Sequence, residues 1–192
     1  NGFAALSEFL QSSQLPFVSS LQGKTACDES LERYLGTLGS YGNRCANMAV
    51  ANADLVLVLG SRLDLRQTGG VVASFASSGE VIHLDIDANE LEHSRLNNTQ
   101  NIHGDLVAAL TYLVSRVSKF TDNTWLNYLA QLKARYNQTQ EVVRTQIKSA
   151  PYDLITVLNK ISQDGDSFCA DVGQNQMWTM QMLKLTQNQH FY

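Results

Sequence analysis

The sequence predicts an α/β protein: a parallel sheet flanked by helices, followed by an incomplete second α/β unit. Three observations support this. Helical and strand-like apolar patterns alternate through residues 1–118, the order in which crossover helices connect parallel strands. The run Leu55-Val56-Leu57-Val58-Leu59 is apolar without alternation, as in strands covered on both faces. A second helix-strand-helix order begins after residue 150.

Residues 1–118 supply the elements of the first sheet. An N-terminal helical pattern precedes a strand-like run at Phe17-Val18, and a helix over 43–53 leads directly into the apolar strand 55–59. Further strands are predicted at 81–86 and 100–102, and then a helix over 105–117 with Asp105 as its N-cap. This order is typical of a Rossmann-like domain, and we expect its first strand to be missing because the sequence opens in a helix.

The remaining residues divide into a connector and a second unit. Residues 119–150 are polar with a helical period, which predicts one or two surface helices. Residues 151–192 predict a helix with Pro151 in its first turn, a turn at 164–166, a strand at 167–172 and a helix from about Gln176. One strand between two helices leaves open edges, so we expect this unit to continue in a longer chain or to dock onto a partner.

Composition excludes several classes of function. The net charge is −4 with no run of Lys or Arg, which argues against nucleic acid or an anionic membrane as partner. No apolar stretch approaches bilayer length and no signal-peptide pattern opens the sequence, so we expect a soluble, cytoplasmic protein. Three cysteines without CxxC spacing and four scattered histidines indicate neither a disulfide framework nor a zinc site.

Two predicted strands end in residues suited to a ligand. Loop 60–70 follows the strand 55–59, and Arg62 and Arg66 could present donors to a diphosphate where ligands bind open α/β sheets. The alternative is a solvated loop whose Arg and Asp side chains pair with each other. Asp85-Ile86-Asp87 closes the next strand, where a carboxylate often accepts ribose hydroxyls. Alternatively, Asp87 caps the following helix.

Two further segments place polar residues before helices. Loop 36–42 is rich in glycine and could bind an anion through backbone N–H groups, or it could be a flexible connection. The more specific segment is 171–178, because Gly173 allows a ligand to approach, and the amides of Gln174 and Asn175 could donate to phosphate oxygens at a helix N-terminus. Met177 and Trp178 are more typical of a core than of a cofactor contact.

Together these segments resemble the acetolactate-synthase group of thiamine-diphosphate enzymes, in the same order and over most of the chain. The resemblance covers the family's middle domain (1–118), a helical connector (119–150, which carries no motif) and the N-terminal part of the thiamine-diphosphate-binding domain (151–192). The matching motifs are Ser20-Leu21-Gln22-Gly23-Lys24, Gly36 to Gly42, Ala53-Asp54-Leu55 leading to Arg62 and Gly69, Asp85-Ile86-Asp87, and Asp171 to Trp178.

The resemblance implies an enzyme that decarboxylates a 2-oxo acid and transfers the product to a second carbonyl compound. It implies thiamine diphosphate with Mg²⁺, and a homodimer or homotetramer with the cofactor between subunits. The glutamate that activates the cofactor and the G-D-G…N segment that holds Mg²⁺ are absent from this sequence, so the chain alone should be inactive and has no catalytic or metal residues to assign. A 2-oxo acid decarboxylase of the same superfamily and a stand-alone nucleotide-binding module are the alternatives.

The same resemblance assigns cofactor contacts. Gly173, Gln174 and Asn175 would meet the diphosphate, with Asn175 in place of the family's histidine. The middle domain would hold FAD, another adenine nucleotide or nothing, since Leu63, Leu65, Tyr41 and Ala88 depart from the pattern of the FAD-binding members. The middle-domain candidates are Ser20, Leu21, Gly39, Tyr41, Gly60, Arg62, Asp64, Arg66, Asp85, Ile86, Gly104 and Asp105.

Overall fold

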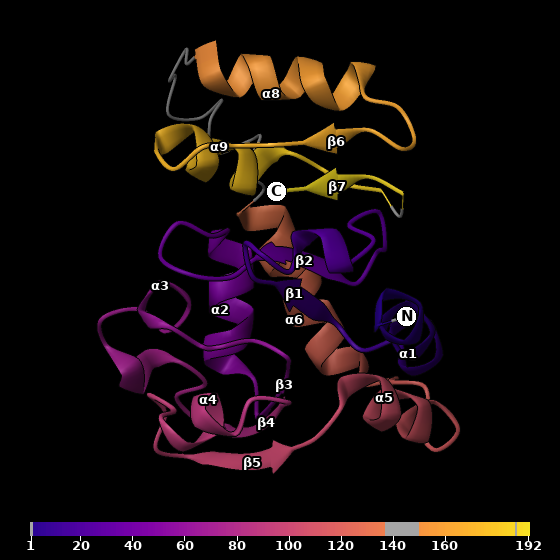
Figure 1. Cartoon of the computed structure of the whole chain (residues 1–192), viewed down its shortest axis with the longest axis vertical. Helices are drawn as coiled ribbons and strands as arrows, with labels where there is room; N and C mark the ends of the chain where they lie inside the picture. The colour runs from indigo at the N-terminus through magenta and orange to yellow at the C-terminus, as the bar shows by residue number, and fades with distance from the viewer. Residues whose placement is uncertain (1, 137–149, 187) are drawn as a thin grey trace. The chain divides into compact units, whose positions relative to one another are not determined.

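The computed structural model describes residues 2–136, 150–186 and 188–192 (Figure 1). The chain divides into two compact units. The first unit consists of Asn1–Leu15 and Met48–Thr121, and the second unit consists of Pro16–Asn47 and Asp122–Tyr192. Helix α2 (Arg44–Asn52) contributes residues to both.

A three-stranded parallel sheet forms the centre of the first unit (Figure 1). Its strands are β3 (Leu55–Leu59), β4 (Glu80–Asp85) and β5 (Thr99–His103), in the order β3-β4-β5. Each strand pairs in register with its neighbour, so all three carboxyl ends lie at one edge of the sheet.

Helices and turns complete the first unit. Helix α1 (Gly2–Ser13) packs against α5 (Leu106–Val114), and α4 (Ala88–Glu92) lies against β4 and β5. The connection between β3 and β4 contains the short helix α3 (Leu65–Thr68) and the 3-10 turn η2 (Val72–Ser74).

The second unit contains two small parallel sheets. Strand β1 (Phe17–Ser19) pairs with β2 (Tyr34–Thr37), and the 3-10 turn η1 (Lys24–Ala26) lies between them in the chain. Strand β6 (Ser167–Phe168) pairs with β7 (His190–Phe191).

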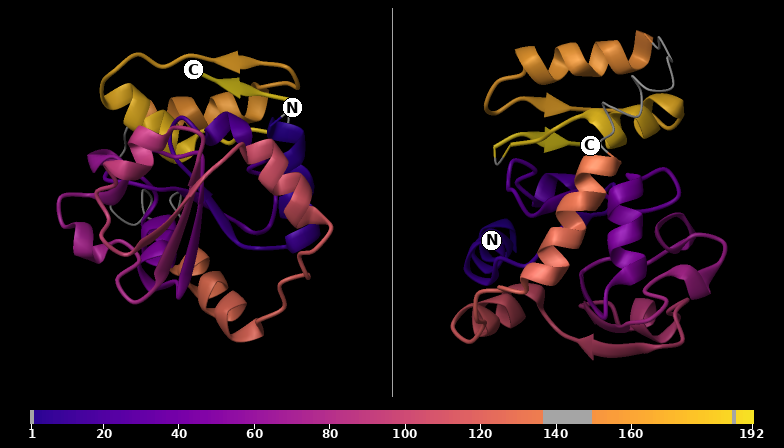
Figure 2. Two further views of the ribbon diagram at one scale, coloured as in Figure 1. Left: turned by 60° about the horizontal axis from the view of Figure 1, so that its bottom comes forward. Right: turned by 180° about the vertical axis from the view of Figure 1, so that it is seen from behind.

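Among its described residues, the second unit has the helices α6 (Asn123–Arg135), α8 (Ala150–Ile161) and α9 (Gln174–Met182) beside its part of α2. Helix α8 lies along the β6-β7 pair (Figure 2). Ile155 of this helix belongs to a buried apolar cluster with Met182, Leu183, Leu185 and Phe191, against which Tyr152 and Trp178 pack. Burial of this cluster holds the C-terminal segment together.

The structure confirms the α/β class and most of the predicted elements. The strand predicted at 55–59 has those bounds, and Asp105 caps α5 by accepting a hydrogen bond from the backbone N–H of Ala108. The connector contains a helix, α6, as predicted. The second half of the connector, residues 137–149, lies outside the described residues. The boundaries at 118 and 150 stay a prediction.

Three features differ from the prediction. The strand expected at 167–172 is only two residues long, because its partner β7 pairs with only Ser167 and Phe168. The short strands β2 and β7 were not predicted. Leu55 was expected to be covered on both faces but is 52% exposed at the start of β3, while Val58 of the same strand is buried.

The packing of α1 against α5 can be tested at Leu110, which is completely buried in α5. We expect Leu110→Ala to lower the free energy of unfolding by about 2–5 kcal/mol, because the truncation leaves a cavity. Thr111→Ala, at an exposed position on the same helix, should change it little. Urea denaturation followed by circular dichroism measures both, and equal effects for the two variants would contradict this packing.

Candidate functional site

The carboxyl ends of the first unit's strands are joined by backbone hydrogen bonds. The N–H of Gly60, after β3, donates to Leu84 O at 2.9 Å, and the N–H of Gly104, after β5, donates to Asp85 O at 2.9 Å. Gly60 has a φ of +59°, which lets the chain turn away from the sheet directly after β3. The predicted loops therefore start from one sheet edge, where open α/β sheets bind ligands.

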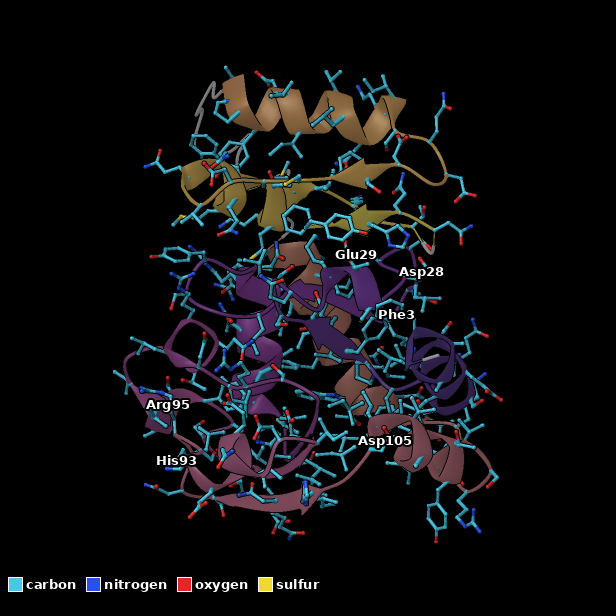
Figure 3. All side chains as sticks on the ribbon, viewed as in Figure 1. Phe3, Asp28, Glu29, His93, Arg95 and Asp105 are labelled. Atoms are coloured by element: carbon cyan, nitrogen blue, oxygen red, sulfur yellow. The ribbon has the colours of Figure 1, made fainter. Side chains whose placement is uncertain are left out.

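The acidic candidates at this edge act as local caps. Asp64 accepts hydrogen bonds from the N–H groups of Arg66 and Gln67 in α3. Asp105, which is labelled in Figure 3, accepts one from the N–H of Ala108 in α5. Asp85 Oδ1 accepts a hydrogen bond from the N–H of Asp87 at 2.9 Å, and Asp87 in turn caps α4. A carboxylate has two oxygens with several acceptor sites, so a cap does not exclude a ligand. The capping predicted for Asp87 is confirmed.

The predicted basic candidates are both exposed. Arg62 pairs with Glu90 through Nε at 2.8 Å and Nη2 at 2.7 Å, while its side chain remains 75% exposed. The hydrogen bond and charge of Glu90 raise the pKa of Arg62. Arg62 therefore pairs with an acid that lies 28 residues along the chain, and not with an aspartate of its own loop as the alternative interpretation expected. Arg66 is exposed in α3.

The other first-unit candidates are backbone positions near the same edge. Ile86 is 69% exposed, and its carbonyl oxygen lies 3.0 Å from Nε2 of His103 at the end of β5. Leu63, which stands where the resembling family has an aromatic residue, is buried. This buried leucine anchors loop 60–70 to the unit.

His83 was not identified from the sequence. It is fully buried in β4, and within the described part of the chain neither ring nitrogen has a hydrogen-bond partner. Its Nε2 lies 3.9 Å from Oδ2 of Asp85, which is too long for a hydrogen bond. The signal in the sequence was the single polar residue inside the run Val81-Ile82-His83-Leu84.

The remaining candidates lie in the second unit. Gly173 is the N-cap of α9 and offers no side chain to the first N–H groups of that helix, and Gln174 and Asn175 are exposed at its start. Uncapped N–H groups together with the helix dipole favour an anion at this position.

The four candidates before α2 have mainly structural contacts. Ser20 Oγ accepts a hydrogen bond from the N–H of Gly23, and Leu21 packs against the apolar cluster. Both backbone polar groups of Gly39 bind the Asn47 side chain at 2.9 Å. Tyr41 is exposed, and its carbonyl oxygen accepts from the Gln181 side chain. Each unit thus carries its own set of candidates.

A buried ion pair was also missed by the sequence analysis. Lys24 Nζ lies 2.6 Å from Glu29 Oε1, and both side chains are 2% exposed (Glu29 is labelled in Figure 3). Glu29 also accepts from the Tyr34 hydroxyl at 2.7 Å and from the N–H of Leu185 at 3.0 Å. Burial lowers the pKa of Lys24, although Glu29 opposes this shift. Burial also raises the pKa of the neighbouring Cys27 to about 12.

Two classes of site are not seen in the described residues. Over 2–136, 150–186 and 188–192, no three His, Cys, Asp or Glu side chains are grouped to hold a metal ion. In the same residues, no helix is both long enough and apolar enough to cross a bilayer.

Comparison with known proteins gives consistent matches. The family described as "Thiamine pyrophosphate enzyme, central domain" matches residues 1–113. The acetolactate synthase large subunit of Cyanidium caldarium is 34% identical over 181 residues, which cover 91% of this chain and 30% of the relative. The acetolactate synthase isozyme 2 large subunit of Escherichia coli K12 is 32% identical over 194 residues, which cover 97% of this chain and 33% of the relative. The acetolactate synthase large subunit of Lactococcus lactis is 35% identical over 175 residues, which cover 90% of this chain and 30% of the relative. The chain spans about a third of the length of these curated relatives.

The buried and exposed ion pairs should differ in their effect on stability. We expect Lys24→Met to lower the free energy of unfolding by about 3–5 kcal/mol, because Glu29 would be left charged and buried without its partner. Arg62→Met removes the same kind of charge from an exposed pair and should change stability little. Chemical denaturation of both variants tests this, and similar losses would show that the Lys24–Glu29 pair is not buried in solution.

Proposed function

The chain belongs to the thiamine pyrophosphate enzymes, and from this premise we propose that it forms part of an acetolactate-synthase-like enzyme that decarboxylates a 2-oxo acid and joins the product to a second carbonyl compound. One observation carries the proposal. Relatives named as acetolactate synthase large subunits align with 90–97% of the chain, well beyond the central domain that ends at residue 113. The match therefore includes residues of the second predicted domain, which favours a synthase over a stand-alone nucleotide-binding module.

The N-terminus of α9 is the position that we propose for the cofactor's diphosphate. Thiamine diphosphate, when bound, supplies the electron sink for decarboxylation. The backbone N–H groups at Gln174 and Asn175 donate to the phosphate oxygens, and the absence of a capping side chain at Gly173 leaves them available. Asn175, in place of a histidine, donates a neutral hydrogen bond and adds no charge. These groups hold and orient the cofactor and take no part in proton transfer.

The sheet edge of the first unit is the proposed site of a second ligand. FAD is our first choice, and another adenine nucleotide or no ligand are the alternatives. The adjacent strand ends at Gly60, Asp85 and Gly104 support a nucleotide there, since glycines let a ligand approach the backbone and a carboxylate at a strand end can accept hydrogen bonds from ribose hydroxyls. Arg62 lies in loop 60–70, which begins at this edge. To contact the ligand's phosphates, its side chain would either break the ion pair with Glu90 or bind Glu90 and a phosphate together.

The remaining features of the enzyme are proposals as well. Mg²⁺ would accompany the diphosphate, held by the G-D-G…N segment that the family resemblance implies and that this sequence lacks. We also propose a homodimer or homotetramer, as the family resemblance implies, and the cytoplasmic location expected from the sequence.

We expect the 192-residue chain to convert no pyruvate to acetolactate or acetaldehyde, even with thiamine diphosphate and Mg²⁺ supplied. The reason is that it spans about a third of its relatives and none of its assigned residues performs proton transfer. A colorimetric acetolactate assay, with a complete acetolactate synthase as positive control, measures this. Turnover above the protein-free rate would contradict the assignment of the chemistry to other parts of the enzyme.

Calorimetric titration with FAD and with ADP tests the sheet-edge site. We expect at least one of the two to bind, and Arg62→Ala to weaken that binding by about tenfold, the effect of losing one hydrogen bond to a charged group. Arg116→Ala is the matched control, because Arg116 is exposed at the end of α5 and contacts Tyr112. Equal affinity in wild type and Arg62→Ala would remove Arg62 from the site, and no binding of either nucleotide would favour an empty edge.

A further inference from the structure

The C-terminal end of α9 is held by four side chains from three different segments of the second unit. The carbonyl oxygens of residues 180–183 would normally lack partners, because the last four carbonyls of a helix have no intrahelical donor. Here each accepts a side-chain hydrogen bond. The donors are Thr37 Oγ1 to Met180 (3.3 Å), Asn43 Nδ2 to Gln181 (3.2 Å), Asn159 Nδ2 to Met182 (2.8 Å) and Lys24 Nζ to Leu183 (2.9 Å). We call these four side chains the α9 clamp.

Second contacts fix the donors of the α9 clamp. Asn43 Oδ1 accepts from the N–H of Thr37 at 2.8 Å, and Asn159 Oδ1 accepts from the N–H of Lys184 at 2.9 Å. Each asparagine thus bridges a backbone donor and a helix carbonyl, so its amide has one orientation. Lys24 is fixed by its ion pair with Glu29.

Gly36 provides the space for Asn43. A Cβ at Gly36 would lie 2.5 Å from Asn43 Oδ1 and 2.8 Å from Asn43 Cβ, and Gly36 has a φ of +112°. No other residue type meets both conditions without moving Asn43. The glycine in the motif at 36–42 therefore serves the α9 clamp.

The contacts of α9 are distributed unequally along its length. Gln174 and Asn175 in the first turn are exposed, whereas Met180 and Met182 in the last turn are buried. The helix has nine residues and is therefore about 14 Å long, short enough to move as a rigid rod. Its first turn is consequently oriented from its last turn.

The charge of Lys24 also stabilises the last turn of α9, as these hydrogen bonds do. The Lys24 ammonium group lies at the negative end of the α9 dipole, and the proposed diphosphate would lie at the positive end. A cation and an anion at opposite ends of one helix both stabilise its dipole.

We propose that Lys24, Thr37, Asn43 and Asn159 are positioning residues for the diphosphate: by fixing the last turn of α9, they set the direction in which the N–H groups of residues 174–176 point. This inference rests on the proposed function for the identity of the ligand. The orientation of the first turn is a property of the chain itself and can be measured separately.

The test uses two conservative substitutions, Asn43→Asp and Asn159→Asp, in the 192-residue chain at pH 7. Each keeps the Oδ1 acceptor for Thr37 or Lys184 but replaces the donor to α9 with a carboxylate oxygen, which repels the helix carbonyl. Asn101→Asp is the matched control, because Asn101 Nδ2 donates to Leu91 O in helix α4 of the first unit. Thr37→Val removes a third donor without adding charge, should either Asp variant fail to fold.

Two measurements separate the inference from the proposed function. In the clamp variants, the residual dipolar couplings of the N–H groups at 174–177 should change, while those in β6, β7 and α8 remain as in wild type. In the control Asn101→Asp, all couplings of the second unit should remain as in wild type. In a titration with inorganic diphosphate and Mg²⁺, amide shifts at 174–176 should give a dissociation constant about tenfold higher for the clamp variants, as for one lost hydrogen bond.

The outcomes are distinct. Unchanged couplings at 174–177 in Asn43→Asp, Asn159→Asp and Thr37→Val would overturn the inference, whatever binds there. Changed couplings without any diphosphate-induced shift in the wild-type chain would support the clamp and would count against the proposed diphosphate site.

Discussion

The second unit depends on one requirement: buried polar groups must find partners within the protein. Lys24 and Glu29 meet this requirement through each other and through the backbone at Leu183 and Leu185. These contacts join residues separated by more than 150 positions in the sequence. The polar network therefore supplements an apolar cluster that lies mostly within the C-terminal segment, and it ties η1 and β2 to the end of α9.

The sequence revealed the elements whose signals are local. A continuous apolar run located β3, and the capping residue Asp105 located the start of α5. Strands β2 and β7 are four and two residues long and form only by pairing with distant strands, so no local pattern predicts them. The candidate loops were found because they follow strands. The partners of their side chains, such as Glu90 for Arg62, depend on tertiary structure and could not be found.

The sequence analysis missed the structural roles of two residues that belong to motifs. Lys24 and Gly36 were recognised as parts of resembling segments, but their roles depend on Glu29 and Asn43, and nothing in the spacing identifies these partners. A family motif records which residues occur, whereas the structure shows that both act on helix α9. The glycine-rich segment that the sequence presented as an anion-binding loop is also a support for a helix elsewhere in the same unit.

The capping carboxylates at the sheet edge have a consequence for how this domain can diverge. At Asp64, Asp85 and Asp105 the bond that shapes the backbone requires only an oxygen acceptor, which an asparagine would also supply. Substitution of these aspartates by asparagine can therefore remove negative charge from the edge while the loops keep their conformation. The charge that this edge presents to any ligand can therefore change without rebuilding the sheet.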